Sequence, residues 1–148
     1  MSSNLDQLYR QVIMDHYKNP RNKGVIEDNA LTINMNNPTC GDRIQLTLKV
    51  EDGKIESAKF DGEGCSISLA SASMMTQAVK GLPVEDAVKL ANIFYDMMLG
   101  NDYDDESYDL GDIEALSGVS KFPARIKCAT LAWKAMEQGV GKDEEEEE

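Results

Sequence analysis

The stretch LTINMNNPTCGDRIQLTLKVEDGKIESAKF, residues 31–60, contains the pattern that decides the fold. Apolar and polar residues alternate over 31–35 and again over 44–50, which predicts two strands with one buried face each. The Asp-Gly pair at 52–53 is a strong hairpin signal, so residues 54–60 are predicted to form a third, antiparallel strand. The loop between the first two strands contains a cysteine and an aspartate on either side of a glycine.

The third predicted strand does not alternate cleanly. Ile55 is out of phase with Ala58 and Phe60, although all three are apolar. Because side chains alternate between the two faces of a strand, this pattern indicates a β-bulge or a shifted start of the strand.

Helical periodicity flanks the three strands. Helices are predicted over 3–17, 66–80, 82–98 and 123–139, with a short helical turn near 112–116. Pro123 stands where a first helical residue is favoured. A helix, a three-stranded antiparallel sheet and then a run of helices predict an α+β fold, with the helices layered on one sheet face.

Acidic residues are concentrated in two segments of this 148-residue chain, whose net charge is −12. Residues 141–148 contain six acids and one base, and residues 101–114 contain seven acids and no base. The rest of the chain contains 14 acidic and 14 basic residues. We therefore predict one domain over 1–140 and an acidic, disordered tail over 141–148. Nucleic acid binding is disfavoured because it needs a basic face.

The composition favours a cytoplasmic protein that does not enter a membrane. The first residues, MSSNLDQLYRQV, lack a basic segment followed by an apolar one, and no window approaches the ~18 apolar residues of a membrane span. Three cysteines are an odd number, which disfavours a disulfide framework and favours free thiols or metal thiolates.

The three cysteines and one aspartate form a candidate metal site. Cys65 opens a predicted helix and Cys128 lies in the second turn of another, where the helix N-terminus favours a thiolate. If these converge with Cys40 and Asp42, they offer four ligands suited to zinc or to a small iron–sulfur cluster. The spacings match no CxxC signature, however, and a lone cysteine is most often a buried structural residue.

Three basic residues stand within three positions of the candidate ligands. Three thiolates and a carboxylate around a divalent ion would leave a net charge of about −2. Nearby cations should stabilise such a site, and the candidates are Arg43, Arg125 and Lys127.

Four motifs in this order resemble the SufU branch of the NifU-like and IscU-like iron–sulfur cluster assembly proteins. They are IMDHYKNPRNKG at 13–24, NPTCGD at 37–42, GEGCSISLASASMM at 62–75 and KFPARIKCATLAWKA at 121–135. The resemblance extends over about residues 3–139. It implies an α+β fold and a single zinc site formed by Cys40, Asp42, Cys65 and Cys128.

The resemblance also implies a partner and a reaction. A cysteine desulfurase of the SufS type would deliver persulfide sulfur, which would pass on to downstream assembly proteins or apo-proteins. Cys40 is the expected sulfur acceptor, since a loop residue can move while ligands on helices stay fixed. On this interpretation the protein is a sulfurtransferase that acts with the desulfurase. The alternatives are a scaffold for a transient [2Fe-2S] cluster, with iron as the metal, and a structural zinc module for protein contacts.

Two departures from the IscU branch favour sulfur transfer over the scaffold role. That branch has a histidine immediately before its last cysteine, where this chain has Lys127. It also has a Leu-Pro-Pro-Val-Lys chaperone-docking motif, where this chain reads KFPARIK. The segment at 99–117 is similar to the insertion that marks the SufU branch.

The single histidine and the paired methionines are predicted to be structural. His16 falls on the apolar stripe of the first helix, so we expect a packed, hydrogen-bonded side chain rather than a metal ligand. Met74 and Met75, like Met97 and Met98, are expected to fill the core rather than to bind a soft metal.

Overall fold

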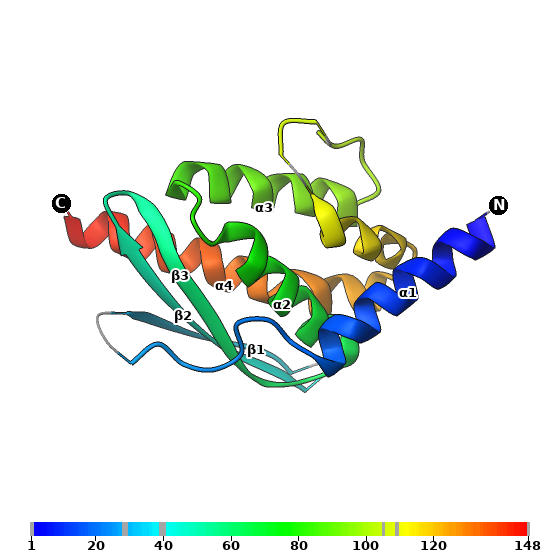
Figure 1. Cartoon of the computed structure of the whole chain (residues 1–148), viewed down its shortest axis with the longest axis horizontal. Coiled ribbons are helices and arrows are strands. Elements are labelled where there is room, and N and C mark those ends of the chain that lie inside the picture. Colours follow the sequence, from blue (N-terminus) through cyan, green and yellow to red (C-terminus); the bar gives the residue numbers. More distant parts are fainter. Residues whose placement is uncertain (1, 28–29, 39–40, 105, 109, 148) are drawn as a thin grey trace.

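The computed structural model describes residues 2–27, 30–38, 41–104, 106–108 and 110–147, and it layers helices on one face of an antiparallel sheet (Figure 1). The elements in chain order are α1 (Ser2–Lys18), β1 (Leu31–Asn37), β2 (Asp42–Glu51), β3 (Lys54–Glu63), α2 (Ser66–Val79), α3 (Val84–Met98), the 3-10 helix η1 (Gly111–Lys121) and α4 (Pro123–Glu147). The predicted α+β fold is confirmed. None of the helices in the described ranges is long and apolar enough to cross a membrane.

The sheet has the order β1-β2-β3, and both pairings are antiparallel. Of the two alternatives for the third strand, a bulge or a shifted start, the structure shows a bulge in β3: Lys49 pairs with Ser57 and Val50 pairs with Ile55, which leaves Glu56 as the extra residue. A one-residue insertion reverses the facing of all later side chains in the strand. Ile55 and Phe60 are therefore both buried, although they are out of phase in the sequence.

The helices cover the sheet in a fixed arrangement. Helix α4 lies against β1 and β2, α2 lies against β3, and α3 packs on α4 on the side away from the sheet (Figure 1). Phe94 of α3 stacks on Trp133 of α4 with ring centroids 4.8 Å apart. The paired methionines at 74–75 and 97–98 are buried in this core, as predicted.

His16 joins three elements and is fully buried. Its Nδ1 lies 2.8 Å from the hydroxyl of Ser73 on α2, and its Nε2 lies 2.7 Å from a carboxylate oxygen of Asp112 in η1. The Ser73 hydroxyl also accepts a hydrogen bond from the Arg21 backbone N–H. The prediction of a packed, hydrogen-bonded histidine is confirmed, and the residue holds α1, α2 and η1 together.

Helix α4 does not end at Gly139, so the predicted helix end is wrong. Glutamate is a strong helix former, which allows the helix to continue into the acidic segment as far as Glu147. Gly139 has a packing role instead: a Cβ there would lie 2.6 Å from Ile33 Cδ1 and 2.7 Å from Leu48 Cδ1. The absence of a side chain lets α4 approach the sheet closely. The division into a domain at 1–140 and a tail at 141–148 stays a prediction.

This close approach predicts opposite effects for two glycines of the same helix. Alanine in place of either glycine gains up to about 1 kcal/mol of helix propensity. At Gly141 a Cβ meets nothing within 4 Å, so Gly141→Ala should stabilise the protein. At Gly139 the methyl group must displace two core side chains, which costs about 1–3 kcal/mol and should make Gly139→Ala the less stable variant.

Urea unfolding followed by circular dichroism measures this difference. Gly141→Ala is the matched control, because it changes helix propensity without changing the core. Equal stabilisation by both substitutions would contradict a close helix–sheet contact at Gly139.

Candidate metal centre

The candidate site lies at one end of the sheet, where the strand register brings Asn37, Asp42 and Gly64 side by side. Asn37 of β1 pairs with Asp42 of β2, and Arg43 pairs with Glu63 at the end of β3. The next residue along, Gly64, therefore comes opposite Asp42. A Cβ on Gly64 would lie 2.4 Å from Asp42 Oδ1, so only glycine leaves room for the carboxylate here.

Asp42 is buried, with 1% of its surface exposed. Its Oδ1 accepts a hydrogen bond of 2.9 Å from the backbone N–H of Cys65. Its Oδ2 is also buried, yet it has no hydrogen-bond partner among the residues that the structure describes. An unsatisfied buried carboxylate oxygen is costly, by about 1–3 kcal/mol or more, unless something else binds it.

Cys65 stands at the N-cap of α2 and is half-buried. Its Sγ accepts a hydrogen bond of 3.4 Å from the Ser68 backbone N–H. A sulfur in this position receives backbone donors and the positive end of the helix dipole, both of which favour the thiolate. Among the described candidate ligands, Cys65 is half-buried, whereas Asp42 and Cys128 are buried.

Cys128 lies in the second turn of α4 and is fully buried. The side-chain amide of Asn37 lies 3.9 Å from its Sγ, within the range of a hydrogen bond to sulfur. Asn37 is itself buried. Asn37 opens the NPTCGD motif but is not among the predicted site residues.

The structure brings three of the four candidate ligands together. The ligand atoms of Asp42, Cys65 and Cys128 all lie within 4.8 Å of one another. Ligands that bind zinc at roughly 2.0–2.3 Å are spaced on this scale or slightly closer. The donor set and the unsatisfied Asp42 oxygen therefore fit a zinc ion. The fourth candidate, Cys40, lies outside the described residues.

One of the three predicted cations lies at the site. The negative charge of Cys65, followed by the hydrogen bond and charge of Cys128, raises the pKa of the Arg125 guanidinium above its usual value. Arg43 forms an ion pair with Glu63 instead. Lys127 is exposed, and its contribution to the site stays a prediction.

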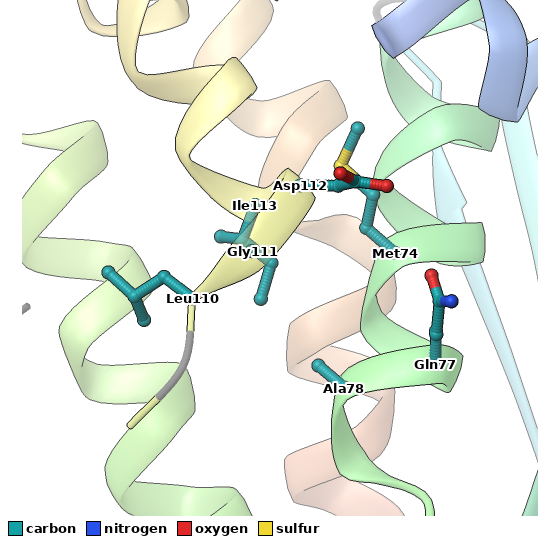
Figure 2. Close-up of a pocket in the computed structure, with 7 residues that line it drawn as sticks. All are labelled: Met74, Gln77, Ala78, Leu110, Gly111, Asp112 and Ile113. Atoms are coloured by element: carbon teal, nitrogen blue, oxygen red, sulfur yellow. The ribbon is translucent and has the colours of Figure 1, made fainter. Parts of the chain in front are cut away.

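A separate cavity of about 350 Å³ lies between α2 and the start of η1 (Figure 2). Its lining residues are Met74, Gln77, Ala78, Leu110, Gly111, Asp112 and Ile113, and none of them is a predicted ligand. The only charged side chain in this lining, Asp112, is paired with His16. The cavity is thus distinct from the candidate metal centre.

Comparison with known proteins gives consistent results over nearly the whole chain. The model of the NifU-like N-terminal domain family matches residues 8–129. The zinc-dependent sulfurtransferase SufU of Bacillus subtilis is 69% identical over 143 residues, which cover 97% of this chain and 96% of the relative. The iron–sulfur cluster assembly scaffold protein IscU of Streptococcus pyogenes is 48% identical, covering 93% and 86% respectively.

A solved structure shares the architecture as well. It is that of a proposed iron–sulfur cluster assembly scaffold protein for the SUF system from Fervidobacterium islandicum AW-1. The two chains are 32% identical and superpose with a TM-score of 0.82, covering 88% of this chain and 94% of the other. The family match over most of the chain and these high identities lead to one conclusion: this chain belongs to the NifU-like N-terminal domain family.

Proposed function

We propose that this protein is a zinc-dependent sulfur acceptor in iron–sulfur cluster assembly, and that it takes persulfide sulfur from a cysteine desulfurase. The observation that carries the proposal is the buried carboxylate oxygen of Asp42, unsatisfied beside two converging cysteine sulfurs. The 69% identity to a zinc-dependent sulfurtransferase supports the choice of metal and reaction.

The proposed zinc ligands are Cys40, Asp42, Cys65 and Cys128. Zinc would keep the thiols deprotonated and reduced without redox chemistry of its own. The Asp42 carboxylate would have two roles. Its Oδ1 accepts the hydrogen bond from the Cys65 backbone N–H at the start of α2, and its Oδ2 remains available to the ion. The Asn37 amide orients the Cys128 sulfur, and the Arg125 guanidinium offsets the negative charge of the thiolates.

Cys40 is the proposed acceptor. Its thiolate attacks the terminal sulfur of the desulfurase persulfide, so a new sulfur–sulfur bond forms on Cys40 while the donor bond breaks. The donor cysteine leaves as a thiolate, and the exchange needs no external oxidant or reductant. Cys65 and Cys128 are less suited to this role because Cys65 is held at the N-cap of α2 and Cys128 lies within α4, where it is fully buried. In the sequence, Cys40 is two residues before Asp42, between the end of β1 and the start of β2.

The second candidate function is a scaffold for a [2Fe-2S] cluster, which would then be the cargo of the protein. It is favoured by the 48% identity to a scaffold protein. The same donor set can bind iron and sulfide. The exposed Lys127, in place of the histidine of the IscU branch, favours sulfur transfer.

Metal analysis of freshly purified protein, combined with desulfurase turnover measured with and without it, tests the proposal. We expect about one zinc ion per chain, as for a single mononuclear site, and stimulated turnover. A coloured protein that assembles iron and sulfide would support the scaffold instead. Bound zinc without stimulation or cluster assembly would leave only a structural zinc module.

Replacement of Asp42 should weaken zinc binding. Asp42→Asn removes the carboxylate oxygen available to the ion, and we expect a loss of roughly 100-fold or more in zinc affinity, since even outer residues of metal sites contribute 10–100-fold. Competition with a chromogenic chelator measures this affinity. Asp96→Asn, an exposed acid on α3, is the matched control and should retain the affinity of the unsubstituted protein. Unchanged affinity in Asp42→Asn would exclude Asp42 as a ligand.

The acceptor assignment predicts where transferred sulfur appears. After incubation with a cysteine desulfurase and cysteine, mass spectrometry of alkylated peptides should locate the persulfide on Cys40. Cys40→Ala should abolish this transfer, whereas Cys128→Ala should weaken zinc binding but retain a nucleophile at position 40 and residual transfer. Equal residual transfer by both variants would remove the assignment.

A further inference from the structure

An apolar groove beside the candidate metal centre has no role in the function described so far. It has a volume of about 480 Å³ and lies where α1, the first turn of α2, η1 and the start of α4 meet. We name it the α1–η1 groove. Its lining residues are Tyr9, Arg10, Ile13, Met14, Ser66, Ile67, Ala115, Gly118, Val119, Lys121, Phe122 and Arg125.

The groove combines an apolar interior with a cationic rim. Of the apolar lining residues, Val119 and Ala115 are buried, while Phe122 is 61% exposed. The charged residues of the lining are Arg10, Lys121 and Arg125, and no acidic side chain belongs to it among the described residues. This is unusual in a chain whose net charge is −12. The local positive charge thus favours an acidic partner, although the protein as a whole is acidic.

The groove is continuous with the candidate metal centre. Ser66 and Ile67 directly follow Cys65, and Arg125 interacts with both Cys65 and Cys128. A segment bound in the groove would therefore lie next to Cys65, which is half-buried. The N-terminus of α2, which faces the same place, adds partial positive charge.

We propose that the α1–η1 groove docks an acidic segment of the cysteine desulfurase, with one apolar side chain of that segment anchored against Phe122. This inference rests on the proposed function, because that function supplies the partner. A buried apolar anchor with a complementary charged rim is a common form of protein interface. Nucleic acid is the less suitable occupant, since the lining is mainly apolar and the protein's net charge repels phosphates.

Charge reversal of the rim tests the proposal. The variant Arg10→Glu with Lys121→Glu should raise the Kd for the desulfurase of the same organism by roughly 30-fold or more at low salt, because like charges would face each other. The effect should shrink as the salt concentration rises. The matched control is Lys80→Glu with Lys89→Glu, which changes net charge equally. Lys80 follows the far end of α2 and Lys89 is exposed on α3, so the control should change the Kd by less than about threefold.

Truncation of the exposed aromatic side chain tests the apolar anchor. Phe122→Ala should weaken binding by about tenfold, as expected when a large aromatic side chain that contacts the partner is truncated. Leu99→Ala is the control, because Leu99 is a similarly exposed apolar residue at the end of α3. Zinc content and urea unfolding, measured on every variant, establish that the metal centre and the fold are retained.

The outcomes of these binding and turnover experiments distinguish a failure of the groove proposal from a failure of the proposed function. If the unsubstituted protein stimulates the desulfurase but the rim reversal and its control bind alike, the groove proposal is overturned and the function stands. If the unsubstituted protein neither binds nor stimulates the desulfurase, the proposed function is overturned, and the groove assignment with it. If sedimentation shows self-association that only the rim reversal abolishes, while desulfurase binding is unchanged, the occupant is a second copy and the proposal is overturned.

Discussion

The hydrogen bond from the Cys65 backbone N–H to Asp42 Oδ1 connects the sheet to the helix layer at the point where the candidate ligands meet. This hydrogen bond is possible because residue 64 is a glycine. A Cβ at that position would collide with the Asp42 carboxylate. The same carboxylate is buried with its other oxygen unsatisfied. A buried carboxylate is stabilised only by hydrogen-bond donors or cations. The hydrogen bond to Oδ1 and the predicted metal at Oδ2 would together stabilise the negative charge of Asp42.

The position of Asp42 depends in turn on the bulge at Glu56, which lies beside Lys49 and Val50 near the other end of β2. A regular hairpin from the Asp52–Gly53 turn would place Glu63 opposite Asp42. The extra residue shifts the register so that Gly64 comes opposite instead. One residue of register therefore decides whether a bulky acid or a glycine faces the carboxylate, which explains how an irregularity remote from the site affects its geometry.

Charge is distributed so that the acidic protein keeps a cationic region near the site. The excess acids lie in two segments of the sequence, at 101–114 and 141–148. Asp112 from the first segment is held by His16, at the junction of α1, α2 and η1. The C-terminal end of α4 lies at the opposite end of the molecule from η1 and the start of α4 (Figure 1). Arg125 interacts with Cys65 and Cys128, and no acidic residue is among the described residues that line the α1–η1 groove.

The sequence by itself determined the order of elements, the antiparallel meander and the burial of His16, because alternation, helical periodicity and turn signals are local properties of the chain. It also indicated an irregularity in the third strand, which only the structure identified as a bulge. It also identified the candidate ligands through their chemistry and motifs. Only the tertiary structure decided that Asp42, Cys65 and Cys128 converge, that Asn37 contacts a sulfur, and that Gly139 packs on the sheet rather than ending α4. These facts depend on contacts between residues far apart in the chain, whose geometry is set by strand register and helix packing rather than by neighbouring residues.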